Sequence, residues 1–116
     1  MTVLAPQSPT IVGITPAYTA VTATDSFPAA AGAKYVLHYK CTGGAPVVAT
    51  IDDPTSVAPA GTLAGAFNPD PTLSVPATTG DKMMLIDANR FRDSSGNINL
   101  AHAPTTGGTV AVIGPF

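Results

Sequence analysis

The side chains that could do chemistry in this 116-residue chain are few and scattered. There are two histidines, His38 and His102, one cysteine, Cys41, and seven acidic residues, all of them Asp. A zinc site needs three or four ligands at characteristic spacings, and these residues do not show them. On a strand, His38 and Cys41 would point to opposite faces, so we interpret Cys41 as a small buried apolar residue. The sequence therefore predicts no metal site and no cofactor.

The aspartates are spaced for turns rather than for catalysis. Asp52 and Asp53 are adjacent, which on a strand sends their side chains to opposite faces. A retaining glycosidase needs two facing carboxylates, and no spacing in the chain points to such a pair. The chain also lacks a nucleophile elbow, a phosphate-binding glycine loop and a dinucleotide fingerprint. We therefore expect no enzyme activity. Four other aspartates stand beside Ser, Pro or Gly, where Asp most often accepts hydrogen bonds from nearby backbone amides: Asp25, Asp70, Asp81 and Asp93.

Charge is scarce along the whole chain. Only 10% of the residues are charged, against roughly 25% in a typical soluble domain. Such a surface costs little to desolvate, which favours either a surface that is covered in use or an ordinary Thr-rich β surface. The net charge of −2 and the dispersed basic residues argue against a nucleic-acid partner. No stretch approaches the 18 or so apolar residues of a membrane span, so we expect no membrane partner either.

Targeting and redox signals are also weak. The first nine residues contain two prolines and no basic residue, unlike a secretory signal. A single cysteine cannot form an internal disulfide. We therefore expect synthesis and assembly in a reducing cytoplasm.

The elements that must position these residues are strands. The chain has no Glu, 16 Thr, 11 Gly and 12 Pro, a composition that favours strands and turns over helices. The clearest strand is 34–41, which places four apolar or aromatic residues on one face and three polar residues on the other. Gly43-Gly44 predicts a tight hairpin turn into a returning strand at 47–51. The inward face of 34–41 is Tyr35, Leu37, Tyr39 and Cys41, and the outward face is Lys34, His38 and Lys40.

Further strands are expected between turn signals at regular intervals. They lie at 17–24, 73–75, 82–87, 97–103 and 109–113, with one helical turn at 88–92 and a second hairpin at Gly107-Gly108. Short strands at this spacing indicate an all-β, antiparallel two-sheet β-sandwich of jelly-roll or Ig-like type, which would occupy 17–116. The predicted core contains Tyr35, Leu37, Tyr39, Ile98, Leu100, Val110 and Val112.

Two Pro-rich segments fall outside this pattern. Residues 1–16 are expected to form an extended N-terminal arm, with a disordered terminus as the alternative. Residues 53–72 are expected to form a long loop, and such loops are often functional. Leu63 and Phe67 in that loop would either contact a partner or fold back on the core. Phe91 has two alternatives as well: it would join a contact cluster with its neighbouring arginines, or it would cap the core while both arginines are solvated. The candidate partner contacts are Leu4, Pro6, Ile11, Leu63, Phe67, Arg90 and Arg92.

Four segments, 22–27, 34–40, 73–81 and 89–93, together carry a family resemblance. They read TATDSF, KYVLHYK, LSVPATTGD and NRFRD. They resemble an Asp-x-Phe entry, an aromatic strand ending in a basic residue, a Val-Pro-Ala segment followed by Gly-Asp, and an aromatic-Arg-Asp turn. This plan is similar to small virion proteins of tailed phages, especially those of actinobacterial hosts, that act as capsid decoration (cement) proteins. The segment from Asp53 to Pro71 is longer than the family pattern, which leaves its capsid contacts open.

The resemblance implies a virion structural protein on the outer capsid surface, made in the cytoplasm of the host bacterium. Its expected partners are the major capsid protein and further copies of itself, with a trimer as one option. A head–tail connector or tail component is the second structural reading. A carbohydrate-binding β-sandwich module is the alternative from another class, with Tyr18, Tyr35 and Tyr39 as aromatic faces, although two of these are expected to point into the core.

Overall fold

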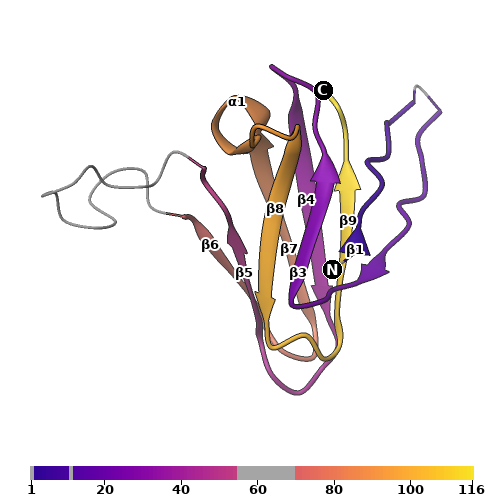
Figure 1. Ribbon diagram of the computed structural model, residues 1–116. Coiled ribbons are helices and arrows are strands. Elements are labelled where there is room, and N and C mark those ends of the chain that lie inside the picture. Colours follow the sequence, from indigo (N-terminus) through magenta and orange to yellow (C-terminus); the bar gives the residue numbers. More distant parts are fainter. Residues whose placement is uncertain (1, 11, 55–69) are drawn as a thin grey trace, which may run out of the picture.

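Two β-sheets face each other in the computed structural model, which describes residues 2–10, 12–54 and 70–116 (Figure 1). Sheet A has the order β1-β3-β8-β5-β6, and sheet B has the order β2-β9-β4-β7. Every strand pair is antiparallel except β1–β3. The predicted all-β fold is confirmed, and the two layers are compatible with a β-sandwich. The strands of sheet A are β1 (Thr2–Val3), β3 (Thr24–Pro28), β8 (Asn97–Ala103), β5 (Val47–Ile51) and β6 (Thr72–Val75). Those of sheet B are β2 (Thr19–Ala20), β9 (Gly108–Ile113), β4 (Lys34–Cys41) and β7 (Gly80–Asp87).

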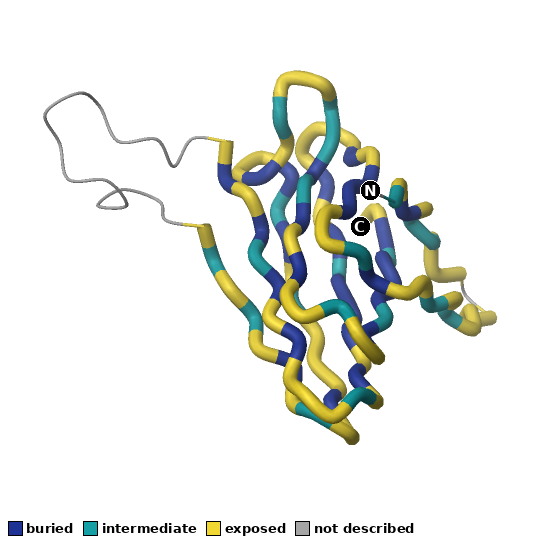
Figure 2. Tube along the Cα trace, turned by 60° about the horizontal axis from the view of Figure 1, so that its bottom comes forward, coloured by how far each residue is buried: buried dark blue, intermediate teal, exposed yellow. Residues whose placement is uncertain are grey.

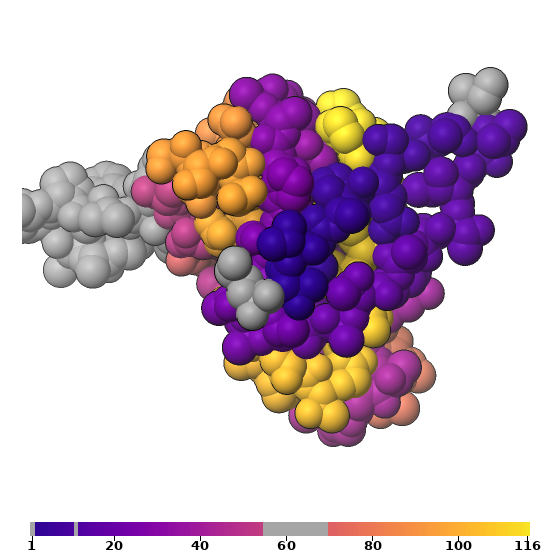
Figure 3. Space-filling model, turned by 45° about the vertical axis from the view of Figure 1, so that its right-hand side comes forward, coloured from indigo at the N-terminus to yellow at the C-terminus, as the bar shows by residue number. Residues whose placement is uncertain are grey.

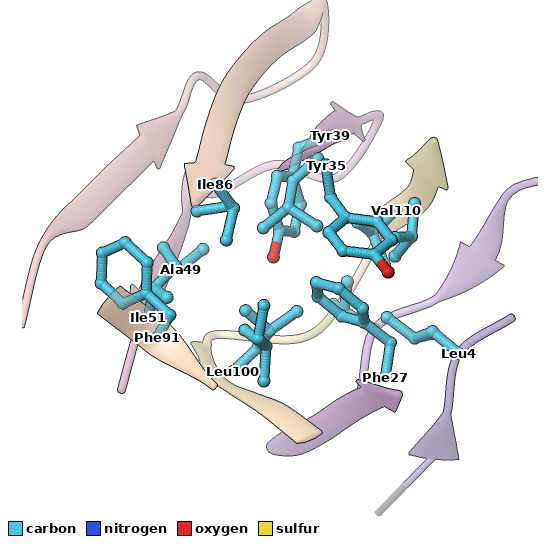
Figure 4. Close-up of a cluster of buried hydrophobic side chains, with 14 of the residues drawn as sticks. Leu4, Phe27, Tyr35, Tyr39, Ala49, Ile51, Ile86, Phe91, Leu100 and Val110 are labelled. Atoms are coloured by element: carbon cyan, nitrogen blue, oxygen red, sulfur yellow. The ribbon is translucent and has the colours of Figure 1, made fainter. Parts of the chain in front are cut away.

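The core lies between the sheets and is built by period-two alternation. Along β5 and β8, buried residues alternate with exposed or half-buried ones (Figure 2). Aromatic and branched side chains from both sheets meet in the middle, and Figure 4 shows Tyr35, Tyr39 and Val110 of sheet B facing Phe27 and Leu100 of sheet A. All seven residues predicted for the core are buried, and so is Cys41. The alternation of β4 and β8 is therefore confirmed.

One helical turn, α1 (Ala88–Phe91), follows β7 as predicted. Asp87 begins it, because its side chain accepts a hydrogen bond from the backbone N–H of Asn89 at 2.9 Å. Phe91 is buried and packs against the core. This confirms the alternative in which Phe91 caps the core.

The two predicted Gly-Gly hairpins are wrong. β4 belongs to sheet B and β5 to sheet A, so Gly43-Gly44 leads the chain from one sheet to the other, and Gly107-Gly108 does the same between β8 and β9. The two corners touch: the Thr42 N–H donates to the Gly107 carbonyl at 3.0 Å. A Cβ on Gly107 would lie 2.4 Å from the backbone nitrogen of Gly43. The glycines therefore permit a close backbone approach.

The strand expected at 17–24 is replaced by two shorter ones. β2 covers Thr19–Ala20, and β3 runs through Asp25 and Ser26, beyond the predicted end of the strand at residue 24. Asp25 is tolerated inside a strand because its buried carboxylate accepts hydrogen bonds from Thr22 and Thr2. A buried carboxylate with such partners no longer carries the cost of an unpaired charge.

The N-terminal segment lies against the edges of both sheets, so the expected extended arm is not confirmed. β1 pairs in parallel with β3, and Leu4 is buried in the core with 4% exposure. Further along, the Gln7 N–H donates to the Val112 carbonyl at 2.8 Å, and the Gly114 N–H donates to the Gln7 carbonyl at 2.8 Å. Most of the loop predicted at 53–72 lies outside the described residues.

Candidate binding surfaces

A buried polar chain crosses the core from sheet B to sheet A. The Tyr39 hydroxyl lies 2.8 Å from Nε2 of His102, and Nδ1 of His102 lies 3.1 Å from Oδ2 of Asp25. The side chains of His102 and Asp25 are fully buried. The N–H of Thr2 donates to Asp25 at 3.1 Å, which ties β1 to the same chain. Because it is sealed from solvent, this arrangement fixes the packing of the sheets rather than presenting groups to a ligand.

The environment of this chain sets its ionisation. Burial acts to raise the pKa of Asp25, but hydrogen bonds from Thr22 and Thr2, together with the charge of His102, outweigh burial and hold that pKa below its usual value. Burial, and then the negative charge of Asp25, strongly raise the pKa of Tyr39. Asp25 is therefore ionised and Tyr39 protonated at neutral pH.

A second polar chain lies on the outer face of sheet B. The Tyr18 hydroxyl is 2.7 Å from Nδ1 of His38, and Nε2 of His38 bonds to Asp81 on β7. The ammonium of Lys40 stands 4.7 Å from the centre of the Tyr18 ring. The bond from His38 lowers the pKa of Asp81. These contacts hold Tyr18 against β4, where its ring packs edge-to-face with the His38 ring.

Beside this chain, β4 and β7 expose an apolar strip. Met83 and Leu85 on β7 are 65% and 62% exposed. Val36 on β4 pairs with Leu85 in the sheet and is half-buried. β7 is the outermost strand of sheet B in the described part of the chain. Large apolar side chains that cluster on a surface strand are typical of a protein-binding face.

Residues 8–10 and 12–17, here called the projecting loop, stand out from the body (Figure 3). Gln7 joins the two ends of this loop by two hydrogen bonds. Its side-chain amide donates to the Ala17 carbonyl and accepts from the Ala17 N–H, each at 2.8 Å. Near the tip, the N–H of Gly13 donates to the Thr10 carbonyl at 2.9 Å. Val12 is 90% exposed. The loop thus presents an apolar side chain on a closed base.

A shallow groove of about 430 Å³ runs over the outer face of sheet A, lined by Thr24, Thr50, Asn99, Asp52 and Asp70 among others. Burial, and then the nearby charges of Asp70 and Asp53, raise the pKa of Asp52. Among the described residues, no aromatic side chain lines this groove.

The predicted contact residues fall in different places. Leu4 is buried in the core and presents no surface to a partner, so its prediction as a partner contact is corrected. Pro6 is half-buried. Arg90 pairs with the buried carboxylate of Asp53 at 2.8 Å. Arg92 is exposed, and its Nε donates to the Ala29 carbonyl at 2.7 Å. The remaining three lie outside the described residues: Ile11, Leu63 and Phe67.

Sequence reasoning missed both polar chains and the apolar strip. His38 and Asp81, like His102 and Asp25, are far apart in sequence and meet only through strand pairing. The sequence did indicate the apolar strip, because Met83 and Leu85 lie two residues apart and therefore on one face of a strand. The segment 82–87 has apolar residues on both faces, however, so the sequence did not show which face points outward. The turn role predicted for Asp93 is confirmed, because Asp93 accepts from the N–H groups of Ser95 and Asn97.

Within residues 2–10, 12–54 and 70–116, no group of three or more His, Cys, Asp or Glu side chains is arranged to hold a metal ion. No helix in the same ranges is long and apolar enough to cross a membrane. Comparisons with protein-family models, with curated proteins and with solved structures gave no match to this chain.

Proposed function

We propose that this protein is a virion structural protein that decorates the capsid of a tailed phage and stabilises it by bridging major capsid protein subunits. The observation that carries the proposal is the projecting loop of residues 8–10 and 12–17, which exposes Val12 on a base fixed by Gln7. The four segments that resemble phage cement proteins and the low charge of the chain support the same function.

We propose further that the fold is a jelly roll. This is supported by the strand orders β2-β9-β4-β7 and β3-β8-β5-β6, with β1 added at one edge. Successive strands from β2 to β9 change sheets at every step except β5 to β6, as two interleaved Greek keys require. Jelly rolls are common in viral capsid proteins and in lectins, so the fold favours a virion role only by analogy.

The proposed contact is broad and uncharged rather than focused in a pocket. Val12 and Ile14 on the projecting loop are exposed and apolar, and their burial against a capsid would be driven by the hydrophobic effect. Such a contact depends little on salt, because few charges are there to be screened. Many modest contacts repeated by capsid symmetry add up through multivalency.

The test compares capsids with and without the protein. Capsids that lack it should assemble but break more readily under heat or osmotic shock. Val12→Asp should lower occupancy while the protein stays folded. Val48→Asp on sheet A, 38% exposed in the wild type, serves as the matched control. Because Leu4 is buried and β1 is paired, substitution at the tip is a sharper test than deletion of 1–16.

Two outcomes would redirect the proposal. Equal survival of both kinds of particle removes the cement function. Density for this chain at one vertex alone favours the head–tail connector. The carbohydrate-binding alternative rests on Tyr18, since Tyr35 and Tyr39 are buried, and glycan affinity in the absence of any capsid would support it.

A further inference from the structure

The outer faces of β4 and β7 form four cross-strand rows with an ordered chemistry. In both end rows a Lys on β4 stands opposite an Asp on β7, so β4 is basic at its two ends and β7 is acidic at its two ends. The two middle rows hold the apolar strip and His38. In order along the strands, the rows are Lys34–Asp87, Val36–Leu85, His38–Met83 and Lys40–Asp81.

We infer that this face docks a second copy of the chain, face to face, about a two-fold axis parallel to the strands. A half turn about such an axis places β4 of one copy over β7 of the other. Each row keeps its position along the strands, so it faces the same row of the second copy. Lys34 then meets Asp87 of the second copy, and Lys40 meets Asp81 of the second copy. Leu85 covers Val36 in the same way. Every row is complementary to itself, as an isologous interface requires.

The exposure of the face fits this arrangement. Met83 and Leu85 form its centre and are more than half exposed in the single chain. The lysines at its ends are exposed as well. An apolar centre with a charged rim is the usual anatomy of a protein interface, and the matching of opposite charges fixes the register of the two copies. Sheets that pack face to face in this way keep their strands roughly aligned.

Edge-to-edge pairing of two β7 strands fits the residues less well. If Met83 of one copy stood opposite Leu85 of the other, the antiparallel register would place Asp81 opposite Asp87, and like charges directly opposite each other are destabilising. Lys82 points to the inner side of β7, the side of its cross-strand neighbour Tyr39. An inward-pointing charge on an edge strand hinders the addition of another strand. The outer face, not the edge, is therefore the docking surface.

Tyr18 borders the face without blocking it. Its ring reaches His38 from the side of β2, which lies beyond β9 and opposite the open edge at β7. The half turn carries the ring of each copy past the β7 edge of the other. The two tyrosines would thus flank the interface and limit sideways sliding.

The inference rests on this face alone and not on the proposed capsid role, so it is tested on the isolated protein. Sedimentation velocity over a range of concentrations should show a monomer–dimer equilibrium for the wild type. Leu85→Asp should raise the dissociation constant about tenfold or more. Val48→Asp, on the outer face of sheet A, should leave it unchanged. A wild type that stays monomeric, or a dimer that Leu85→Asp leaves intact, would overturn the inference.

A charge exchange then tests the proposed register. Lys34→Asp and Asp87→Lys should each weaken the homodimer, because each places like charges together in both symmetry-related contacts of the row that holds these residues. When the two variants are mixed in equal amounts, both symmetry-related contacts of this row regain opposite charges, so native mass spectrometry should show clearly more heterodimer than the half share expected from random pairing. A statistical mixture would refute this register. Lys34→Asp spares the helix cap at Asp87, so if Asp87→Lys fails to fold, weaker dimerisation of Lys34→Asp decides the question.

Discussion

The hydroxyl of Tyr39 on β4 lies 2.8 Å from Nε2 of His102 on β8, so a single hydrogen bond spans the core and joins the two sheets. His102 in turn contacts Asp25 on β3, and Asp25 accepts a bond from the first residue of β1. Three strands of sheet A and the central strand β4 of sheet B are thereby held in one arrangement. Buried polar networks of this kind specify a particular packing when every member has a partner.

Tyr39→Phe should destabilise the protein by about 1–3 kcal/mol, because it leaves Nε2 of the buried His102 without its partner. Urea denaturation measures the change. Tyr35→Phe is the matched control: its hydroxyl accepts from the N–H of Ala30, an exposed residue where water can take its place. The control should lose less than the first variant. Equal losses would contradict a special role for the bond across the core.

Asp25→Asn should cost about 1.5–3 kcal/mol at neutral pH, the usual contribution of hydrogen bonds to a charged group, because the buried carboxylate accepts bonds from Thr22 and Thr2. The folded pKa of Asp25 is held below the unfolded value of 3.8, so the stabilisation by its charge is complete above that value. It is lost as the pH falls from there through the lower folded pKa. The difference in unfolding free energy between the wild type and Asp25→Asn, measured by denaturation at several pH values, should therefore become smaller below about pH 4. A difference that is constant with pH would show that the Asp25 charge is not what stabilises the fold.

Leu37→Ala should destabilise the protein by about 2–5 kcal/mol, because Leu37 is completely buried on the inner face of β4 and its loss leaves a cavity. Thermal or chemical denaturation measures the loss. Val48→Ala, at a partly exposed site on sheet A, should change stability by about 0.5 kcal/mol or less. A small effect at Leu37 would mean that the inner face of β4 is misplaced.

Gly107→Ala and Gly32→Ala separate steric clash from backbone strain. Both glycines have a positive φ, +77° and +78°, but a Cβ on Gly32 meets nothing within 4 Å. Gly32→Ala should therefore cost about 1–2 kcal/mol for the left-handed conformation alone. Gly107→Ala should cost more, since its Cβ would collide with the backbone of Gly43 at the crossing of the two corners. Denaturation midpoints compare the two, and equal costs would argue against the close contact.

Lys82→Val should make the protein aggregate faster. Lys82 is exposed and lies on the inner side of the edge strand β7, where a charge discourages the addition of another strand. Light scattering during incubation at a fixed temperature follows the change. Lys40→Val on the central strand β4 is the control, because both backbone edges of β4 are already paired. Faster aggregation of the control as well would point to lost charge rather than to an unguarded edge.

Local pattern was enough to predict most of the strands. The alternation in 34–41 and 97–103 reproduces β4 and β8 with their bounds and inward faces, because a half-buried strand must alternate. The helical turn after β7 was also predicted, from 88–92. These features depend on neighbours in sequence.

Pairing between distant strands could not be predicted in the same way. A Gly-Gly pair permits a hairpin and a corner between sheets equally well, and the difference depends on which strands lie alongside. Asp25 was predicted to lie in a turn, because its partner His102 is far away in sequence and could not be identified from local pattern. Leu4 sat among prolines in a segment that resembled a free arm, yet it fills a place in the core. Each error concerns a contact that only tertiary packing creates.

The places of β8 and β9 bear on how the protein is made. β8 lies between β3 and β5, and β9 lies between β2 and β4, so the two described strands that are synthesised after the others lie in the middle of both sheets. Until they emerge, β2 and β3 have no antiparallel neighbour among the described strands. Neither of the two described layers can therefore close before β8 and β9 have been synthesised, and long-range pairing makes that closure slow.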